Sequence, residues 1–207
     1  MDKHSNAVPT APDHDQSRGG AALIIVDMIN DFAFPGGKVL EPKARAIASA
    51  MLEMRGAIER AGWPVIYVND NFGEWHSEKS KLVEAAIASG SEVARMMRPG
   101  DEHYFIIKPK LSGFYATNLA VLLPKLGASR LIITGVAADM CVLFTAADAH
   151  MRDYRLWIPA DLVAGEDDER ARAALDIMAE SMAAETRPTS KLGLAEWLAD
   201  CDRSVRS

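Results

Sequence analysis

The segment AALIIVDMINDFAFPGG, residues 21–37, decides the fold of this chain. Residues 21–26 form a continuous apolar run that ends at Asp27, and the turn-rich sequence after it cannot continue a strand. A short apolar run without polar alternation is typical of a strand buried on both faces of a parallel sheet. The segment therefore predicts a central parallel strand that delivers an acidic residue to the edge of the sheet.

A helix is predicted directly after this strand, because apolar residues recur at helical spacing through residues 42–62 and the segment stops at Gly62. The alternation then continues along the chain. Further strands are predicted at 65–68, 104–107, 131–134 and 156–159, and further helices at 81–89, 118–126, 141–151 and 166–184. Residues 186–191 are a possible sixth strand, which Pro188 would restrict to a sheet edge because proline cannot donate to a ladder.

Repeated strand–helix alternation predicts right-handed crossovers and helices on both faces of the sheet. We therefore expect a doubly wound α/β fold of the Rossmann-like kind, with a mainly parallel sheet of five or six strands. Residues 21–207 are predicted to form a single domain, and the polar residues 1–20 a flexible N-terminal arm.

Composition excludes several classes of partner. The 207 residues carry 23 basic and 29 acidic side chains, a formal charge of −6, and no run of Lys or Arg, so we expect no nucleic-acid partner. No apolar stretch approaches the ~20 residues that cross a bilayer, and the N-terminal arm lacks the apolar core of a signal peptide. We expect a cytoplasmic protein that does not bind membranes.

Two cysteines, Cys141 and Cys201, are too few for a disulfide framework. At least one thiol therefore needs another explanation. Cys141 lies at the predicted start of a helix. For Cys201, near the C-terminus, the sequence motifs suggest no catalytic role, and this residue is interpreted as structurally incidental.

Three polar residues, Asp27, Lys108 and the Cys141 that follows the fourth strand, are delivered to one edge of the predicted sheet. Singly, each has an ordinary interpretation as a turn cap, a solvated cation and a small buried side chain. Because the carboxyl ends of parallel strands meet at one edge, the three can meet in one crevice. A carboxylate, an ammonium and a thiol supply a base, a charge stabiliser and a nucleophile. The helix start and Lys108 are expected to lower the thiol pKa.

A Cys–His arrangement is disfavoured by distance. His150 lies nine residues along the helix of Cys141, about 13 Å away at 1.5 Å per residue. His103 lies at the opposite end of the third strand from Lys108, about 16 Å away. Only His76 is left near the predicted site.

Four motifs together resemble the isochorismatase-like cysteine hydrolases, a superfamily that includes nicotinamidases, N-carbamoylsarcosine amidases, ureidoacrylate amidohydrolases and isochorismatases. They are LIIVDMINDF with FPGG, VIYVNDNFGEW, IIKPKLSGFYATNL and LIITGVAADMCVLFTAADA, and the resemblance spans about residues 21–190. It implies the hydrolase fold of that family, a catalytic triad of Asp27, Lys108 and Cys141, and a homo-oligomer, either a dimer or a tetramer.

The resemblance also implies a non-proline cis peptide between Val136 and Ala137, which directs the backbone N–H groups of Ala137 and Cys141 at a substrate oxyanion. Ala138 stands where relatives commonly have Thr, so a hydroxyl is missing near the site. Asp139 is expected to act as the N-cap of the following helix.

The zinc site of nicotinamidases provides a test of subfamily, since its strand-two loop supplies Asp and His two residues apart. Here the residue two positions after Asp70 is Phe72 and not His. Asp70 with His76 gives too few ligands for a metal site. We therefore expect no metal and no cofactor, and a hydrogen-bonding role for Asp70.

Residues near the predicted loops are candidates to wall a pocket for a small amide, although about half of the aromatic ones could be core. These candidates are Phe32, Phe34, Asn69, Phe72, Trp75, Phe114 and Tyr115. Phe144 and Trp157 are instead predicted to be buried packing residues.

The expected function is metal-independent hydrolysis of a carbon–nitrogen bond, amide or carbamoyl, in a small molecule through a thioester on Cys141. Two alternatives stay open. A vinyl-ether hydrolase of the isochorismatase type would use Asp27 as an acid and tolerate loss of the thiol. A non-catalytic small-molecule binding module would keep the fold without a reactive thiol.

Overall fold

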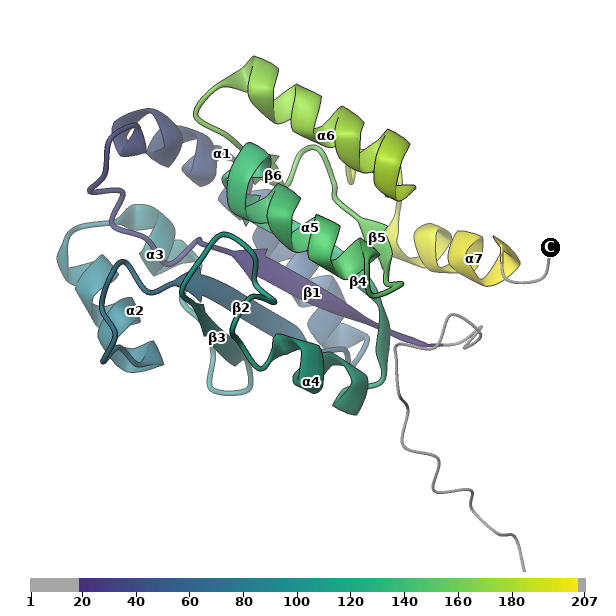
Figure 1. The fold of residues 1–207 in the computed structure, drawn as a ribbon, viewed down its shortest axis with the longest axis horizontal. Helices are drawn as coiled ribbons and strands as arrows, with labels where there is room; N and C mark the ends of the chain where they lie inside the picture. Colours follow the sequence, from purple (N-terminus) through teal and green to yellow (C-terminus); the bar gives the residue numbers. More distant parts are fainter. Residues whose placement is uncertain (1–18, 205–207) are drawn as a thin grey trace, which may run out of the picture.

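The computed structural model describes residues 19–204, so most of the predicted N-terminal arm lies outside the described residues. A six-stranded sheet with strand order β3-β2-β1-β4-β5 forms the centre, and β6 pairs with β4 (Figure 1). Every named strand pair is parallel. This confirms the predicted doubly wound α/β class.

All five predicted strands are present with shifted ends, and a sixth strand, β6, lies at residues that were not predicted to form one. The strands are β1 (Gly20–Val26), β2 (Val65–Asp70), β3 (Tyr104–Lys108), β4 (Ala128–Val136), β5 (Arg155–Trp157) and β6 (Val163–Ala164). The sixth strand is thus not at residues 186–191, where the chain forms irregular structure and a turn. Next to that segment, Glu185 makes only an isolated bridge to Trp157.

The predicted helices are also present, and α3 and α7 are additional to the ranges given above. The helices are α1 (Gly37–Arg60), α2 (Lys79–Ala88), α3 (Glu92–Met96), α4 (Leu119–Lys125), α5 (Leu143–His150), α6 (Asp168–Met182) and α7 (Leu194–Ser204). Helix α1 begins five residues before the predicted start, because Gly36 turns the chain with a left-handed φ of 90° and Pro42 is accommodated inside the helix.

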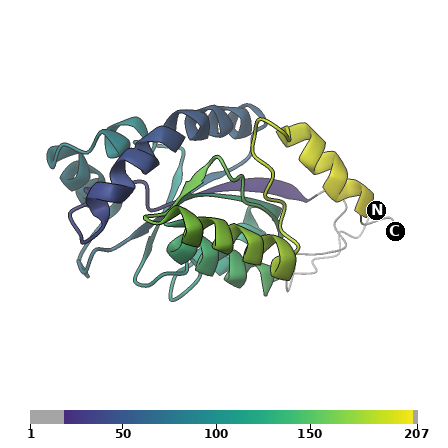
Figure 2. The same cartoon turned by 90° about the horizontal axis from the view of Figure 1, so that it is seen from above.

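The sheet is covered on both faces, as the view from above shows (Figure 2). Alternate residues of β1 enter opposite clusters: Leu23 and Ile25 face the side of α1, α3 and α7, and Ile24 and Val26 face the side of α4, α5 and α6. This double burial explains why the strand reads as a continuous apolar run without polar alternation.

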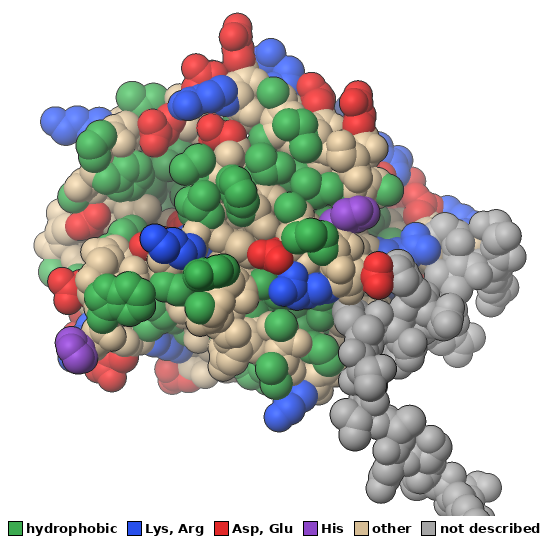
Figure 3. All heavy atoms as spheres, in the orientation of Figure 1, with side chains coloured by type: hydrophobic (Ala, Val, Ile, Leu, Met, Phe, Trp, Pro, Cys, Tyr) green, Lys and Arg blue, Asp and Glu red, His purple; other side chains and the backbone are tan. Residues whose placement is uncertain are grey.

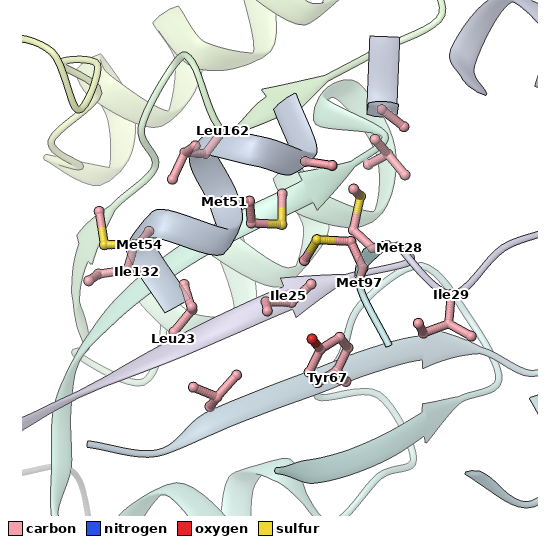
Figure 4. Packing of buried hydrophobic residues seen from close by; sticks show 14 of the residues in the cluster. Leu23, Ile25, Met28, Ile29, Met51, Met54, Tyr67, Met97, Ile132 and Leu162 are labelled. Carbon is pink, nitrogen blue, oxygen red and sulfur yellow. The ribbon is translucent and has the colours of Figure 1, made fainter. Parts of the chain in front are cut away.

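Methionines of α1 carry much of the packing on the first face (Figure 4). Met51 and Met54 lie over Leu23 and Ile25 of β1, and Tyr67 continues the same surface on β2. Full burial of each such side chain stabilises the fold by about 1.5–3 kcal/mol. The helical spacing seen in residues 42–62 therefore reports a real core face.

Of the two residues predicted to be buried packing residues, the structure confirms one and contradicts the other. Trp157 is fully buried and packs on Trp197, whereas Phe144 is 47% exposed, so the prediction of a buried Phe144 is wrong. The helix α5 turns other residues inward, namely Thr145, Ala146 and Ala149. Cys201 is buried in the hydrophobic cluster on the face of the sheet that α1, α3 and α7 cover, as a small apolar side chain would be.

The surface carries charges of both signs among hydrophobic side chains on the face shown in Figure 3. Within residues 19–204, no helix has the length and apolar character needed to cross a membrane.

The strand order creates a switch point between β1 and β4, because the chain leaves β1 toward the face of α1 and leaves β4 toward the face of α5. Ligands of doubly wound sheets bind at such a point, beyond the carboxyl ends of the strands. At this point β4 approaches β1 closely, because a Cβ atom on Gly135 would lie 2.1 Å from the Val26 carbonyl oxygen. Gly135 also has a φ of +112°, which other residues rarely adopt.

Substituting Gly135→Ala should therefore destabilise the fold. We expect a loss of about 3 kcal/mol or more in the free energy of unfolding, from a backbone clash added to positive-φ strain. The matched control is Gly62→Ala, also at positive φ but with nothing within 4 Å of the added methyl. The control should lose only about 1 kcal/mol in urea denaturation. Equal losses in the two variants would contradict the close-approach argument.

Candidate active site

Asp27 is placed by the first turn after β1. Its φ of 52° is left-handed, a conformation that non-glycine residues rarely adopt, and its N–H donates to the Val68 carbonyl at 3.0 Å. The carboxylate is buried and accepts the Asp70 N–H on Oδ1 at 2.7 Å. Backbone geometry therefore aims this carboxylate along the sheet edge and fixes its position.

Lys108 ends β3, two strands from β1, at a distance of about 10 Å given the usual strand spacing. Its long side chain spans that gap and is fully buried. The Nζ atom lies 2.9 Å from Asp27 Oδ2, 3.2 Å from Cys141 Sγ and 3.2 Å from Asp70 Oδ2. An ammonium has three N–H donors, so each of them has one acceptor here.

Cys141 lies in a π-helical turn, Ala138–Val142, and not at the first residue of α5 as expected. The turn is closed by the Val142 N–H, which donates to the Ala137 carbonyl at 3.2 Å. Single π turns often occur at functional sites because they re-aim one side chain. Here the thiol is half-buried and contacts both Lys108 and Asp27.

The three predicted residues are thus brought together in one buried cluster. Burial raises the pKa of Asp27 above its usual range, against the lowering effect of Lys108. Burial alone would lower the pKa of Lys108, but the charges of Asp27, Cys141 and Asp70 outweigh it, so the pKa rises and the side chain stays an ammonium.

The expected lowering of the thiol pKa is not found. Burial and the neighbouring Asp27 carboxylate raise the pKa of Cys141 to about 12, although Lys108 acts in the opposite direction. Desolvation, which sequence position does not reveal, therefore dominates over the cation. The resting cluster therefore holds a neutral thiol beside the Lys108 ammonium.

The peptide bond between Val136 and Ala137 is cis, as the resemblance implied. It follows the close approach of Gly135 to β1 and precedes the π turn, so it lies at the switch point. Asp139, in contrast, makes no capping hydrogen bond within this turn. Its carboxylate pairs with Arg170 of α6 at 3.5 Å, so the predicted N-cap role is wrong.

Asn69 is buried and ties two loops together. Its Oδ1 accepts the Ile29 N–H at 3.1 Å, and its Nδ2 donates to the Ile29 carbonyl at 2.9 Å. The amide is therefore committed to the backbone after β1, which holds Asp27 and the end of β2 in register. These hydrogen bonds give Asn69 a positioning role, and its contact with substrate stays a prediction.

The loop after Lys108 is anchored to α5. Ser112 donates to the Asp148 carboxylate, and the Gly113 N–H donates to Thr145 Oγ1 at 3.0 Å. Phe114 is buried, and the Arg152 guanidinium lies over its ring, with Cζ 4.8 Å from the ring centroid. These contacts lock the loop that continues from Lys108.

The predicted aromatic residues divide between core and surface. Phe32 and Phe114 are buried, which matches the expectation that some of them are core. The other four are exposed and stay candidates for substrate contact: Phe34, Phe72, Trp75 and Tyr115.

The zinc site of nicotinamidases does not fit the residues present. The Asp70 carboxylate faces the Lys108 ammonium and the Phe72 N–H, and His76 is exposed. Among the described residues, the group that could bring three ligand atoms together is Glu59, Glu102 and His103, away from this cluster. There His103 accepts the Gly100 N–H on Nδ1, so Nε2 carries the proton and donates to Glu59.

Sequence reasoning missed the contact of Asp70 with the Lys108 ammonium. The available signal was its position at the end of β2, but its use required the strand order, which places β2 between β1 and β3.

Comparison with known proteins gives the family. The model of the isochorismatase domain matches residues 21–189. The uncharacterized isochorismatase family protein YaaI of Bacillus subtilis is 41% identical over 170 residues, which cover 82% of this chain and 94% of that protein. The streptothricin hydrolase of Streptomyces noursei is 30% identical over 192 residues, which cover 92% of this chain and 69% of that protein.

A similar solved structure is the N-carbamoylsarcosine amidase of Thermoplasma acidophilum. It has a TM-score of 0.65 and 30% sequence identity, and the match covers 84% of this chain and 98% of that one. The nicotinamidase of Staphylococcus aureus has a TM-score of 0.64 and 26% identity, with coverage of 82% and 98%. From the domain match and these relatives, the chain described here belongs to the isochorismatase family.

Proposed function

We propose that this protein hydrolyses a carbon–nitrogen bond of a small molecule, an amide or a carbamoyl group, through a thioester on Cys141. The observation that carries the proposal is the contact of the thiol with both Asp27 and the buried Lys108 ammonium. Nucleophile, base and charge stabiliser in mutual contact are the arrangement that nucleophilic catalysis requires. Relatives named as a streptothricin hydrolase and an N-carbamoylsarcosine amidase support the same class of reaction.

The first half-reaction forms the thioester. Because the resting thiol is neutral, Asp27 removes the Sγ proton as sulfur attacks the substrate carbonyl carbon. The raised pKa of Asp27 makes its carboxylate a stronger base for this transfer than an ordinary Asp carboxylate. The oxyanion that forms is assigned to the backbone N–H groups of Ala137 and Cys141, next to the cis peptide. Asp27 then gives its proton to the leaving nitrogen as the carbon–nitrogen bond breaks.

The second half-reaction releases the acid. Asp27, again a carboxylate, takes a proton from water, whose oxygen attacks the thioester carbonyl. The carbon–sulfur bond breaks, and the proton returns to Sγ as the thiol is restored. Lys108 stays an ammonium throughout and stabilises the negative charge that moves between Asp27 and sulfur.

Substrate identity is determined by the loops around this cluster, so the proposal is limited to a small amide or carbamoyl compound. Action without a metal and assembly into a homo-oligomer are part of the proposal. The vinyl-ether hydrolase is the competing function on this fold.

Replacing the thiol should separate these functions. Cys141→Ala should lower kcat/KM for amide hydrolysis about a thousandfold or more, because no thioester can form. The measurement is ammonia or amine release across a panel of small amides and carbamoyl compounds. The matched control is Cys201→Ala, which removes the second cysteine thiol and should keep activity near the wild-type value.

A folded Cys141→Ala protein with full amide-hydrolysing activity would contradict the thioester. Retained vinyl-ether cleavage by that variant, without amidase activity in the wild type, would favour the competing function.

The pH dependence should report Asp27. The base must be ionised, and burial raises its pKa, so kcat/KM should fall as the pH drops through a value above the ordinary 3.8 of Asp. Asp27→Asn should lose about a hundredfold or more in kcat/KM and abolish this acid limb. The exposed Asp31→Asn removes an equal charge nearby and should leave the limb in place. An unchanged acid limb in Asp27→Asn would show that another group is the base.

A further inference from the structure

Asp70 is the part of the cluster to which no step above gives a role. It ends β2 and is the register partner of Lys108 in the neighbouring strand β3. Its backbone N–H donates to Asp27 Oδ1 at 2.7 Å, and its side chain contacts the Lys108 ammonium. A second carboxylate therefore lies in direct contact with the charged groups that flank the thiol.

The carboxylate of Asp70 is held in place but not saturated. Oδ1 accepts the Phe72 N–H at 2.7 Å, and Oδ2 accepts from Lys108 Nζ at 3.2 Å. A carboxylate offers about four lone-pair positions, so these two donors leave acceptor capacity for a further N–H group.

Exposure separates Asp70 from the other charges. Its side chain is 32% exposed, whereas the Asp27 side chain is 8% exposed and the Lys108 side chain is fully buried. Of the three charged groups around Cys141, the Asp70 carboxylate is therefore the one most accessible to a molecule in solvent. The cluster has two carboxylates against one ammonium, so its excess charge is negative and its outermost member is an acceptor.

We propose that Asp70 is the specificity-determining residue of this site: it accepts an N–H from a neutral or cationic substrate beside the scissile carbonyl, and it excludes substrates that carry a carboxylate there. The substrate class is then primary amides, ureas and amides of aminated compounds. This inference rests on the proposed function, because it concerns ligands that reach Cys141.

The test uses two thiol reagents of nearly equal size and different charge. Iodoacetamide is neutral and iodoacetate is an anion, and both alkylate a thiolate. The ratio of their rates at one cysteine cancels the thiolate fraction, so a change in thiol pKa or a general loosening of the site leaves the ratio unchanged. Rates at Cys141 are measured at pH 9 by mass spectrometry of its peptide in the intact, folded protein.

We expect the iodoacetamide-to-iodoacetate ratio at Cys141 to exceed that of 2-mercaptoethanol by about fivefold or more, the factor one nearby unit charge gives in a wet site. Asp70→Asn keeps an acceptor oxygen but removes the charge, and it should bring the ratio close to that of the free thiol. Added salt should lower the wild-type ratio as well. The matched control is Glu74→Gln, an exposed carboxylate in the same loop, which should leave the ratio unchanged.

A wild-type ratio equal to that of 2-mercaptoethanol, or one that Asp70→Asn does not change, would overturn the inference. Failure of both reagents to reach Cys141 would overturn it too, since the proposed role of Asp70 requires that small ligands reach this thiol. The outcome is independent of amide turnover: Cys141-dependent hydrolysis with an unchanged ratio removes only the role of Asp70. A charge-dependent ratio in a protein without amidase activity removes only the proposed reaction.

Discussion

The Lys108 ammonium is the interaction on which the rest of the site depends. A fully buried cation is costly unless every donor is paired, and here three acceptors from three other elements meet its three N–H groups. Asp27 comes from the end of β1, Asp70 from the end of β2, and Cys141 from the turn after β4. Losing any one acceptor removes a partner of this buried ammonium, so the strand ends are held together by shared charge as well as by the sheet.

Much of this arrangement could be predicted from sequence, because parallel strands place their carboxyl ends at one edge. Asp27, Lys108 and Cys141 each follow an apolar run, and that is enough to bring them together without knowing the strand order. The contact of Asp70 with Lys108 does need the strand order, since it depends on β2 lying between β1 and β3. A short strand such as Val163–Ala164 carries too few residues to show a pattern.

Other features depend on burial, which a linear sequence does not show. The position of Cys141 near a cation predicts a lowered thiol pKa, but desolvation and Asp27 reverse the sign. Phe144 looks like core by composition, yet α5 turns smaller side chains inward. Asn69 is polar and lies at a strand end, and only the structure shows that its amide forms hydrogen bonds with the Ile29 backbone. In each case the three-dimensional neighbours decide the role of the residue type.

The absence of a side chain at Gly135 has a wider consequence. With main chain against main chain at this point, the separation of β1 from β4 does not depend on the size of any packed residue. The base follows β1 directly and the thiol lies in the turn that follows β4, so the backbone of these two strands sets the positions from which both groups start. The hydrophobic layers on either side can then change in composition over evolutionary time while the distance between the reacting groups is preserved.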